Sequence, residues 1–226
     1  MKKPEPISGW LIGALAIALT LSGCSSSPPP ANWKMNAVSL LEHAQQRWLE
    51  GDSKTADLAL VNARKEVAQS GRIDLLARTE LSACATKVAS LDFSACSAFD
   101  LLANDASPND QAYARFLAGD WTGLDVKTLP AHYADLLSAK DDSAANRAAA
   151  EVKEALPRLI AIGLLFRAGR ADPTSMNIAL DTASERGWRR PLLAWLEVQK
   201  TRAINSGDTA AAATLQRRID LVLGKG

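Results

Sequence analysis

The chain has 226 residues, 23% of them charged and 5% aromatic, and its formal net charge at pH 7 is +1. A chain so close to neutral argues against a nucleic-acid partner, which would require a basic surface. Abundant alanine and few aromatic residues favour an all-α protein, and the length suits one compact domain or one elongated array of repeats.

The N-terminus combines a basic start with a short apolar segment. Lys2 and Lys3 precede "WLIGALAIALTL", residues 10–21, whose twelve residues would rise about 18 Å as a helix, against a hydrocarbon core of about 30 Å. This is too short to span a bilayer comfortably, but it is typical of a secretory signal peptide. The residues "LSGC" at 21–24 resemble the lipobox of bacterial lipoprotein precursors, which reads Leu, a small residue, Gly or Ala, then Cys.

The resemblance to lipoproteins implies a particular processing of the chain. Residues 1–23 would be removed as a signal peptide, and Cys24 would carry a diacylglycerol thioether and a further acyl chain on its new amine. Several acyl chains make membrane attachment effectively permanent. The alternative is an ordinary signal peptide with a cysteine near its cleavage site by chance. In this family an Asp after the cysteine signals retention in the inner membrane. This chain has Ser25 at that place, so the resemblance implies that the protein is anchored at the periplasmic face of the outer membrane. The alternative is the inner membrane.

Residues 24–35 are predicted to be a tether behind the lipidated cysteine. The run "SSSPPPA", residues 25–31, is too rich in Ser and Pro to form a packed core and favours extended polyproline II. Such a segment would reach roughly 20 Å at about 3.1 Å per residue. We therefore expect one folded all-α domain at 36–226, held away from the membrane by this tether.

The first part of that domain shows the clearest repeat pattern. Leu40, Leu41, Ala44, Trp48 and Leu49 recur at helical spacing, a Gly-Asp pair follows at 51–52, and a second helical pattern continues to about residue 67. Small residues stand before the turn and twice after it, with a large residue between the later two. This pattern resembles a tetratricopeptide repeat (TPR), and the residues that match it, including the glycine of the turn, are Ala44, Gly51, Ala56, Leu60 and Ala63. The resemblance implies antiparallel helix pairs in a TPR-like α-solenoid. The alternative is an irregular α-helical bundle.

The Gly-Asp turn recurs at 119–120 and at 207–208, with a looser version at 169–172. Gly51 and Gly119 are 68 residues apart, which is twice the TPR period of about 34 residues, although the later intervals do not fit it. We expect a helix beginning at Pro108, another from Pro130 to about Ala139, and a third capped by Asp142 or Ser143. The apolar run 159–166 predicts a buried central helix, and three further helices are predicted to close the chain at 173–187, 190–207 and 209–224.

Cys84 and Cys96 are the two cysteines that follow the lipobox. In one continuous helix their Cα atoms would stand about 18 Å apart, whereas a disulfide needs roughly 4.4–6.8 Å. The pair therefore requires a turn, which residues 89–94 can provide. The interval of twelve residues equals that of Ala44 and Ala56, so a disulfide here would join the two helices of a middle repeat. The alternative is a pair of buried free thiols.

Two groups of side chains are candidates for binding. Arg186, Arg189 and Arg190 flank Trp188 and could hold an anionic group, although a solvated turn is the simpler interpretation. Trp48 and Trp195 fall on first helices of predicted pairs, which in TPR proteins line the concave groove. They are therefore candidate contact residues, with filling of the core as the alternative.

The sequence offers little for catalysis. His43 and His132 lie far apart and match no metal-binding pattern, and there is no nucleophile elbow or phosphate-binding loop. We predict no catalytic residue, metal or cofactor. The expected function is a lipid-anchored helical adaptor that binds another cell-envelope protein or peptide. The alternative is an envelope enzyme without a local motif, such as one acting on cell-wall glycan, which the shortage of aromatic residues disfavours.

Overall fold

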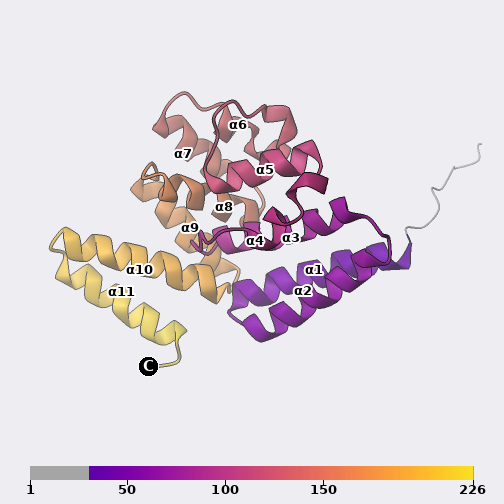
Figure 1. The fold of residues 1–226 in the computed structure, drawn as a ribbon. Helices are drawn as coiled ribbons and strands as arrows, with labels where there is room; N and C mark the ends of the chain where they lie inside the picture. Colours follow the sequence, from indigo (N-terminus) through magenta and orange to yellow (C-terminus); the bar gives the residue numbers. More distant parts are fainter. Residues whose placement is uncertain (1–30, 226) are drawn as a thin grey trace, which may run out of the picture. The chain divides into compact units, whose positions relative to one another are not determined.

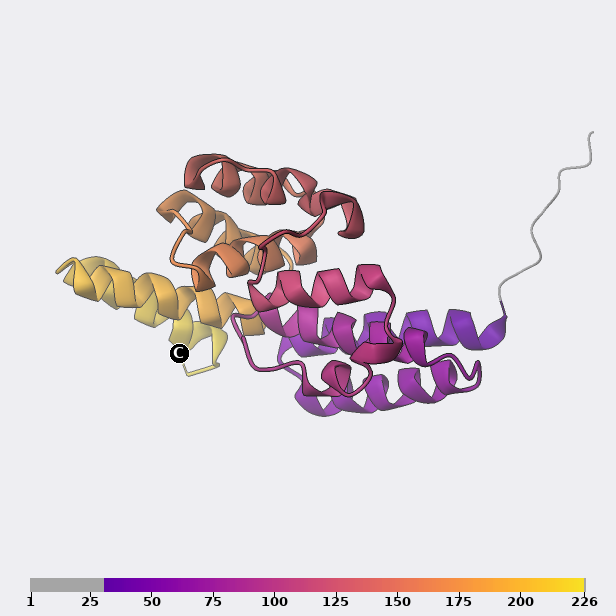
Figure 2. The same ribbon diagram turned by 45° about the horizontal axis from the view of Figure 1, so that its top comes forward.

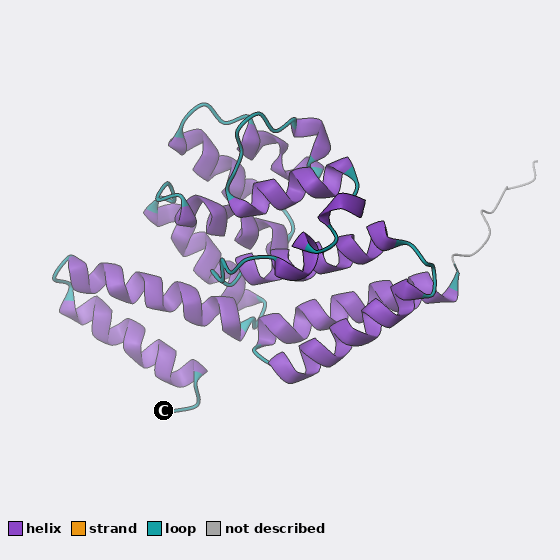
Figure 3. Cartoon of the chain, viewed as in Figure 1, coloured by secondary structure: helices purple, strands orange, loops and turns teal. Residues whose placement is uncertain are grey.

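The computed structural model describes residues 31–225, which contain α-helices and short 3₁₀ turns but no β-strand (Figure 3). The predicted signal peptide, Cys24 and the tether up to Pro30 lie outside the described residues. The α-helices are α1 (Asn32–Glu50), α2 (Ser53–Ala68), α3 (Ile73–Val88), α4 (Ser97–Asp100), α5 (Pro108–Ala118), α6 (Ala134–Leu137), α7 (Asp142–Glu151), α8 (Ala155–Arg167), α9 (Pro173–Glu185), α10 (Arg189–Asn205) and α11 (Thr209–Val222). The 3₁₀ turns are Ala103–Asp105, Val126–Thr128 and Ala131–Tyr133.

The all-α prediction is confirmed, because the elements of the described residues are all helical. The helices pack mainly as adjacent pairs. α1 packs along α2, and the chain from α7 to α11 proceeds as neighbour against neighbour (Figure 1). α1 also contacts α10, and α3 contacts α8, although each pair is far apart in sequence. A strict repeat array has contacts between successive repeats alone, so this arrangement combines paired helices with a bundle-like centre.

The start of α1 differs from the prediction. Helical structure begins at Asn32, so residues 32–35, expected to belong to the tether, are part of the first helix. Of the tether sequence, only Ala31 precedes the helix among the described residues. The predicted C-terminal boundary of the tether at residue 35 is therefore wrong, because the first helix begins at Asn32.

Two of the Gly-Asp pairs form the turns of helical hairpins. Gly51 has a φ of 91° and ends α1, and the carboxylate of Asp52 accepts the Thr55 backbone N–H at 3.1 Å to cap α2. The positive φ explains the glycine, because residues with a Cβ rarely adopt it. Asp208 caps α11 in the same way, accepting the Ala211 N–H at 2.9 Å. These two turns make the α1–α2 and α10–α11 hairpins.

The third Gly-Asp pair does not join two helices. Gly119 ends α5, but Asp120 binds Arg115 at 2.8 Å and no helix follows until the short α6. The predicted helix from Pro130 to about Ala139 is likewise divided into a 3₁₀ turn and α6. The cap of α7 is Asp141, which accepts the Ala144 N–H at 2.8 Å, rather than Asp142 or Ser143. The region between α4 and α7 is therefore much less regular than expected.

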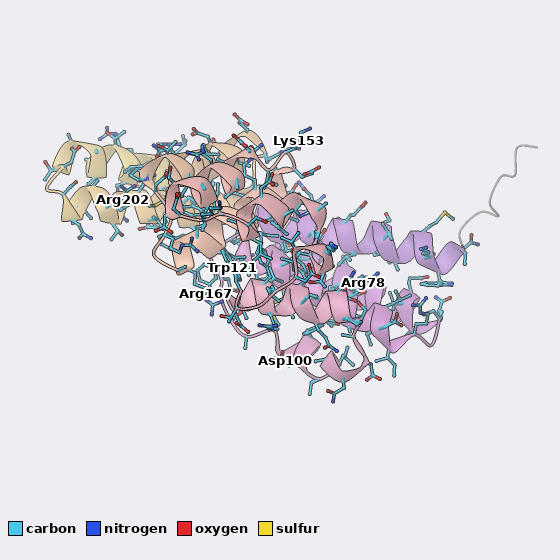
Figure 4. All side chains as sticks on the ribbon, turned by 90° about the horizontal axis from the view of Figure 1, so that it is seen from above. Arg78, Asp100, Trp121, Lys153, Arg167 and Arg202 are labelled. Atoms are coloured by element: carbon cyan, nitrogen blue, oxygen red, sulfur yellow. A yellow bond between two sulfur atoms is a disulfide. The ribbon has the colours of Figure 1, made fainter. Side chains whose placement is uncertain are left out.

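Long-range side-chain bonds hold this irregular region. Arg78 of α3, labelled in Figure 4, donates to both carboxylate oxygens of Asp110 in α5, each at 3.0 Å. Asp110 is buried and also accepts the Ser107 hydroxyl at 2.6 Å. Arg167, labelled in the same figure, lies 5.4 Å from the centre of the Phe93 ring. A charged, bidentate pair with a buried carboxylate fixes the direction in which α5 leaves α3.

The core is centred on α8, as the apolar run predicts. Leu159, Ile162, Leu164 and Leu165 are fully or nearly fully buried. α3 passes close to this helix because residue 163 is glycine: a Cβ there would lie 3.0 Å from the Val88 carbonyl oxygen. Figure 2 gives a second view of this centre, with α8 surrounded by other helices.

The turn after α3 uses an unusual residue. Leu91 has a φ of 59° and is the one non-glycine residue in 31–225 with a positive φ. Its N–H and that of Asp92 close the helix end by bonding the carbonyls of Val88 at 3.0 Å and Lys87 at 3.1 Å. The Leu91 side chain lies 3.5 Å from the position that a Cβ would occupy at Gly163, so its packing on α8 compensates for the backbone conformation. This turn sends the chain back toward Cys96.

Candidate binding groove

The α1–α2 hairpin provides one wall of a groove. Ala44 and Ala56 are both buried, and their small size lets the two helices approach closely. One turn away, the larger side chains of the hairpin project from this contact. Leu41 and Trp48 of α1 and Leu60 of α2 line the wall.

The opposite wall consists of α3 and the segment that returns after Leu91. Cys84 on α3 and Cys96 in that segment are joined by a disulfide, with their Cα atoms 5.7 Å apart. The predicted pairing is thus present in the structure. The expected second helix of a middle repeat is absent, because residues 92–96 form a loop and α4 has a single turn. The disulfide therefore ties a loop, and not a helix, to α3.

Between these walls lies a cavity of about 330 Å³, near the lower end of the size range for ligand pockets. Most of its lining is apolar, and the disulfide forms part of it. The apolar lining residues are Leu41, Ala44, Trp48, Ala56, Leu60, Val61, Ala83, Cys84, Ala95, Cys96, Ala98 and Phe99. We call this cavity and its walls the α1–α3 groove.

One ion pair crosses the groove between α2 and α3. Arg64 donates to both carboxylate oxygens of Glu80, with Nη2 and Oε2 2.7 Å apart. The Glu80 side chain is 6% exposed, so the ion pair with Arg64 offsets the cost of burying it. The hydrogen bonds to Glu80 raise the pKa of Arg64 above its usual value. The pair stabilises the position of α2 against α3 and leaves neither charge free.

Trp48 is held in place from outside the groove. The Arg190 guanidinium lies 4.0 Å from the centre of the indole ring, and its Nε donates to the Trp48 carbonyl oxygen at 2.7 Å. Its Nη2 donates to the Ser53 hydroxyl at 2.6 Å, and burial lowers the pKa of Arg190. Trp188, next to α10, adds a bond from its indole N–H to the Gln46 side chain at 3.1 Å. The start of α10 thus fixes α1 and its tryptophan.

The structure divides the predicted arginine cluster. Arg186 and Arg189 are exposed, whereas Arg190 is turned into the contact with Trp48 and Ser53. The structure does not bring the three side chains into a single anion site, because Nε and Nη2 of Arg190 already donate to the Trp48 carbonyl and the Ser53 hydroxyl. The structure brings together Trp48 and Arg190, which the sequence offered as separate candidates.

Trp195 is not a contact residue. Its side chain is 0% exposed and packs edge-on against Phe166, with ring centres 5.4 Å apart. The interpretation as a groove residue is wrong, and the alternative of core filling is correct. Trp195 lies on the inner face of α10, while the outer part of that helix pairs with α11.

Several groove residues were not identified from the sequence. One face of α3 carries three groove residues at spacings of four and three: Glu80, Cys84 and Lys87. Of these, Cys84 alone was identified from the sequence. Val61 and Phe99 were also missed. Their positions on helices could have indicated them, but the sequence does not predict the path of the loop at 92–96, and therefore does not show which elements face each other.

Other features of the described region offer no clear site. His43 accepts a hydrogen bond from Arg47 at 3.1 Å, and burial lowers the pKa of His132 beside Tyr133. Among residues 31–225 no group of three or more potential ligand side chains could hold a metal ion. No helix in this part of the chain is long and apolar enough to cross a bilayer. Comparison with models of known protein families, with curated proteins and with solved structures finds no match.

Proposed function

We propose that the protein is a lipid-anchored adaptor of the bacterial cell envelope, and that it binds an apolar peptide segment of another envelope protein in the α1–α3 groove. The observation that carries the proposal is the groove itself, an apolar cavity of about 330 Å³ between a helical hairpin and a disulfide-tied loop. Clefts of this kind are the usual places where proteins bind ligands.

A peptide suits the groove because apolar surface continues beyond the cavity. Val38 lies one turn before Leu41 on α1, and Leu58 lies one turn before Val61 on α2. Val38, Leu58 and Val61 are 51%, 62% and 40% exposed. Exposed apolar side chains in a group beside a cavity indicate a surface for another polypeptide. Helical peptides commonly bind such grooves through apolar residues at helical spacing.

The membrane anchor in this proposal rests on "LSGC" at 21–24, with Cys24 as the acylated residue. The protein would then face the periplasm from the outer membrane. We expect Cys24→Ser to abolish labelling with radioactive palmitate and to leave the uncleaved precursor. A Cys24→Ser protein that is still cleaved and still fractionates with membranes would contradict the anchor.

Photocrosslinking in intact cells tests the groove. A photoreactive amino acid at Val61 would lie in the groove, and the same amino acid at Ile204, which is 59% exposed on α10, serves as the control. We expect the Val61 position to give a discrete adduct with an envelope protein and the Ile204 position to give none of the same mass. Equal adducts at both positions, or none at Val61, would contradict a binding role for the groove.

A further inference from the structure

The groove contains one cation, Lys87, that forms no ion pair with the described residues. Its charged lining residues are Asp57, Arg64, Glu80 and Lys87. Arg64 and Glu80 neutralise each other. Asp57 likewise forms no ion pair among the described residues; burial lowers the pKa of Arg190, and the charges of Asp92 and Asp57 partly oppose that lowering. None of the ion pairs within residues 31–225 includes Lys87.

Lys87 lies at the tryptophan end of the groove. Its Nζ is 5.6 Å from the centre of the Trp48 ring, so the indole is flanked by this ammonium and by the Arg190 guanidinium. The Trp48 Nε1–H is buried and has no acceptor among the described residues. This end of the groove therefore holds an ammonium, that of Lys87, which takes part in none of the ion pairs of the described region. A ligand carboxylate would supply the partner that this ammonium lacks.

Resting on the proposed function, we propose that the peptide bound in the α1–α3 groove carries a carboxylate beside its apolar side chains, and that Lys87 binds this carboxylate. The apolar lining from Leu41 to Phe99 would hold the apolar side chains. Lys87 would move from the face of Trp48 to the carboxylate. The carboxylate can belong to an Asp or Glu side chain or to the C-terminus of the partner, since both present the same two oxygens.

The role assigned to Lys87 is specificity, because an apolar groove alone distinguishes poorly between apolar peptides. A peptide with an amide in place of the carboxylate would bind the same walls but leave the ammonium unpaired. Burying an unpaired charge beneath a ligand is costly, so the groove would discriminate against such a peptide. Arg190 supports this end as a positioning residue, since it fixes the Trp48 ring from behind.

Selection from a peptide library tests the proposal. The full-length protein, purified in detergent, is used to select from a random twelve-residue library displayed with free C-termini. Selections are run in parallel on the wild type, on Lys87→Met, and on Lys127→Met as a control, because Lys127 is exposed and lies outside the groove. Val61→Arg, which places a large charged side chain in the groove, identifies the peptides that bind there.

We expect wild-type and Lys127→Met selections to yield apolar peptides enriched in a carboxylate, and Lys87→Met selections to lose that enrichment. Selected peptides are then synthesised as Glu and Gln pairs, and with free and amidated C-termini, which identifies the source of the carboxylate. Removing the carboxylate should weaken binding to the wild type roughly tenfold, about the effect of one charge-assisted hydrogen bond, and leave binding to Lys87→Met unchanged.

The possible failures are distinguishable. Peptides that Val61→Arg blocks but that show no carboxylate preference would overturn the role of Lys87 and leave the proposed function standing. An absence of any peptide that Val61→Arg blocks would overturn the proposed function itself. Lys87-dependent binding to phosphatidylglycerol vesicles, with no peptide selected, would show that the cation recognises lipid and would overturn the peptide proposal.

Discussion

The α1–α2 and α10–α11 hairpins share a turn but differ in how they are buried. Gly51 and Gly207 both have positive φ, and Asp52 and Asp208 both cap the second helix. Yet α2 buries Ala56, Ala59, Ala63 and Val67, whereas α11 buries Ile219 alone. The turn chemistry is sufficient to make a hairpin in either place. A third helix packed across the pair, as α3 packs on α1 and α2, is what makes one of them the wall of a groove.

The C-terminal hairpin is instead attached through one helix. The first half of α10 buries Leu192, Trp195 and Leu196, and α11 packs mainly on α10. Regions with few buried apolar contacts open locally at a lower free energy than the core. We therefore expect the α10–α11 hairpin to fray from its α11 side while the α1–α2 hairpin stays closed. The predictions below test this contrast.

Trp195 is expected to contribute most to the attachment of the C-terminal hairpin. Trp195→Ala should lower the free energy of unfolding by about 3–5 kcal/mol, because it removes a fully buried aromatic side chain and leaves a cavity beside Phe166. Urea denaturation followed by circular dichroism measures this. Trp195→Phe is the control and should cost less, since the Trp195 Nε1–H has no acceptor among the described residues. A loss below about 1 kcal/mol for Trp195→Ala would show that the hairpin is held elsewhere.

The disulfide should have the next largest effect, at the N-terminal side of the contrast. Cys84 and Cys96 close a segment with a separation of 12 residues. Replacing both by Ser should lower the free energy of unfolding by roughly 3 kcal/mol in the chain-entropy description. Hydrogen exchange should speed up in the loop 92–96 and in α4, and stay unchanged in α11. Faster exchange in α11, or recovery of Cys84 and Cys96 as free thiols in unreduced protein, would contradict this prediction.

The sequence predicts the regular parts of this fold because their signals are local. Gly51, Asp52, Gly207 and Asp208 each act within one turn of themselves, so the two hairpins can be read from a few neighbouring residues. Pro108 begins α5 for the same reason. The burial of α8 follows from its continuous apolar run. None of these inferences requires knowledge of which helices will meet.

The irregular middle and the groove depend on contacts that no local pattern contains. Leu91 occupies a left-handed position where glycine would have been the signal, and it does so because its side chain packs near Gly163. The Gly-Asp pair at 119–120 looks like the other two, but its carboxylate binds Arg115 instead of capping a helix. Arg190 meets Trp48 across 142 residues of sequence. The groove therefore becomes visible only when α1, α2 and α3 are placed together.

The three Gly-Asp pairs allow a smaller test with matched substitutions. Asp52→Ala removes a helix cap in a buried hairpin and should lower Tm by roughly 2–4 °C. Asp208→Ala removes the same bond, but we expect a smaller change in Tm and faster hydrogen exchange confined to α11. Asp120→Ala should have the smallest effect, since Asp120 caps no helix and its pair with Arg115 is exposed. Equal losses for all three would show that turn chemistry alone, without the packing of a third helix, decides the contribution.

The smallest expected effect is the pH dependence of the cap at Asp52. Hydrogen bonding to the side chain and then the backbone N–H of Thr55 holds the pKa of Asp52 below its ordinary value of 3.8. A carboxyl whose pKa is lowered in the folded state adds stability above its unfolded pKa, and that contribution is lost as the pH falls through the folded value. Asp52→Asn keeps a capping side chain that does not titrate. We therefore expect the Tm of the wild type to fall relative to that of Asp52→Asn as the pH is lowered from about 5 to about 2, by no more than a few degrees. Thermal melts of both proteins across this range measure the difference, and the cap carries no acid-sensitive stability if the difference stays constant.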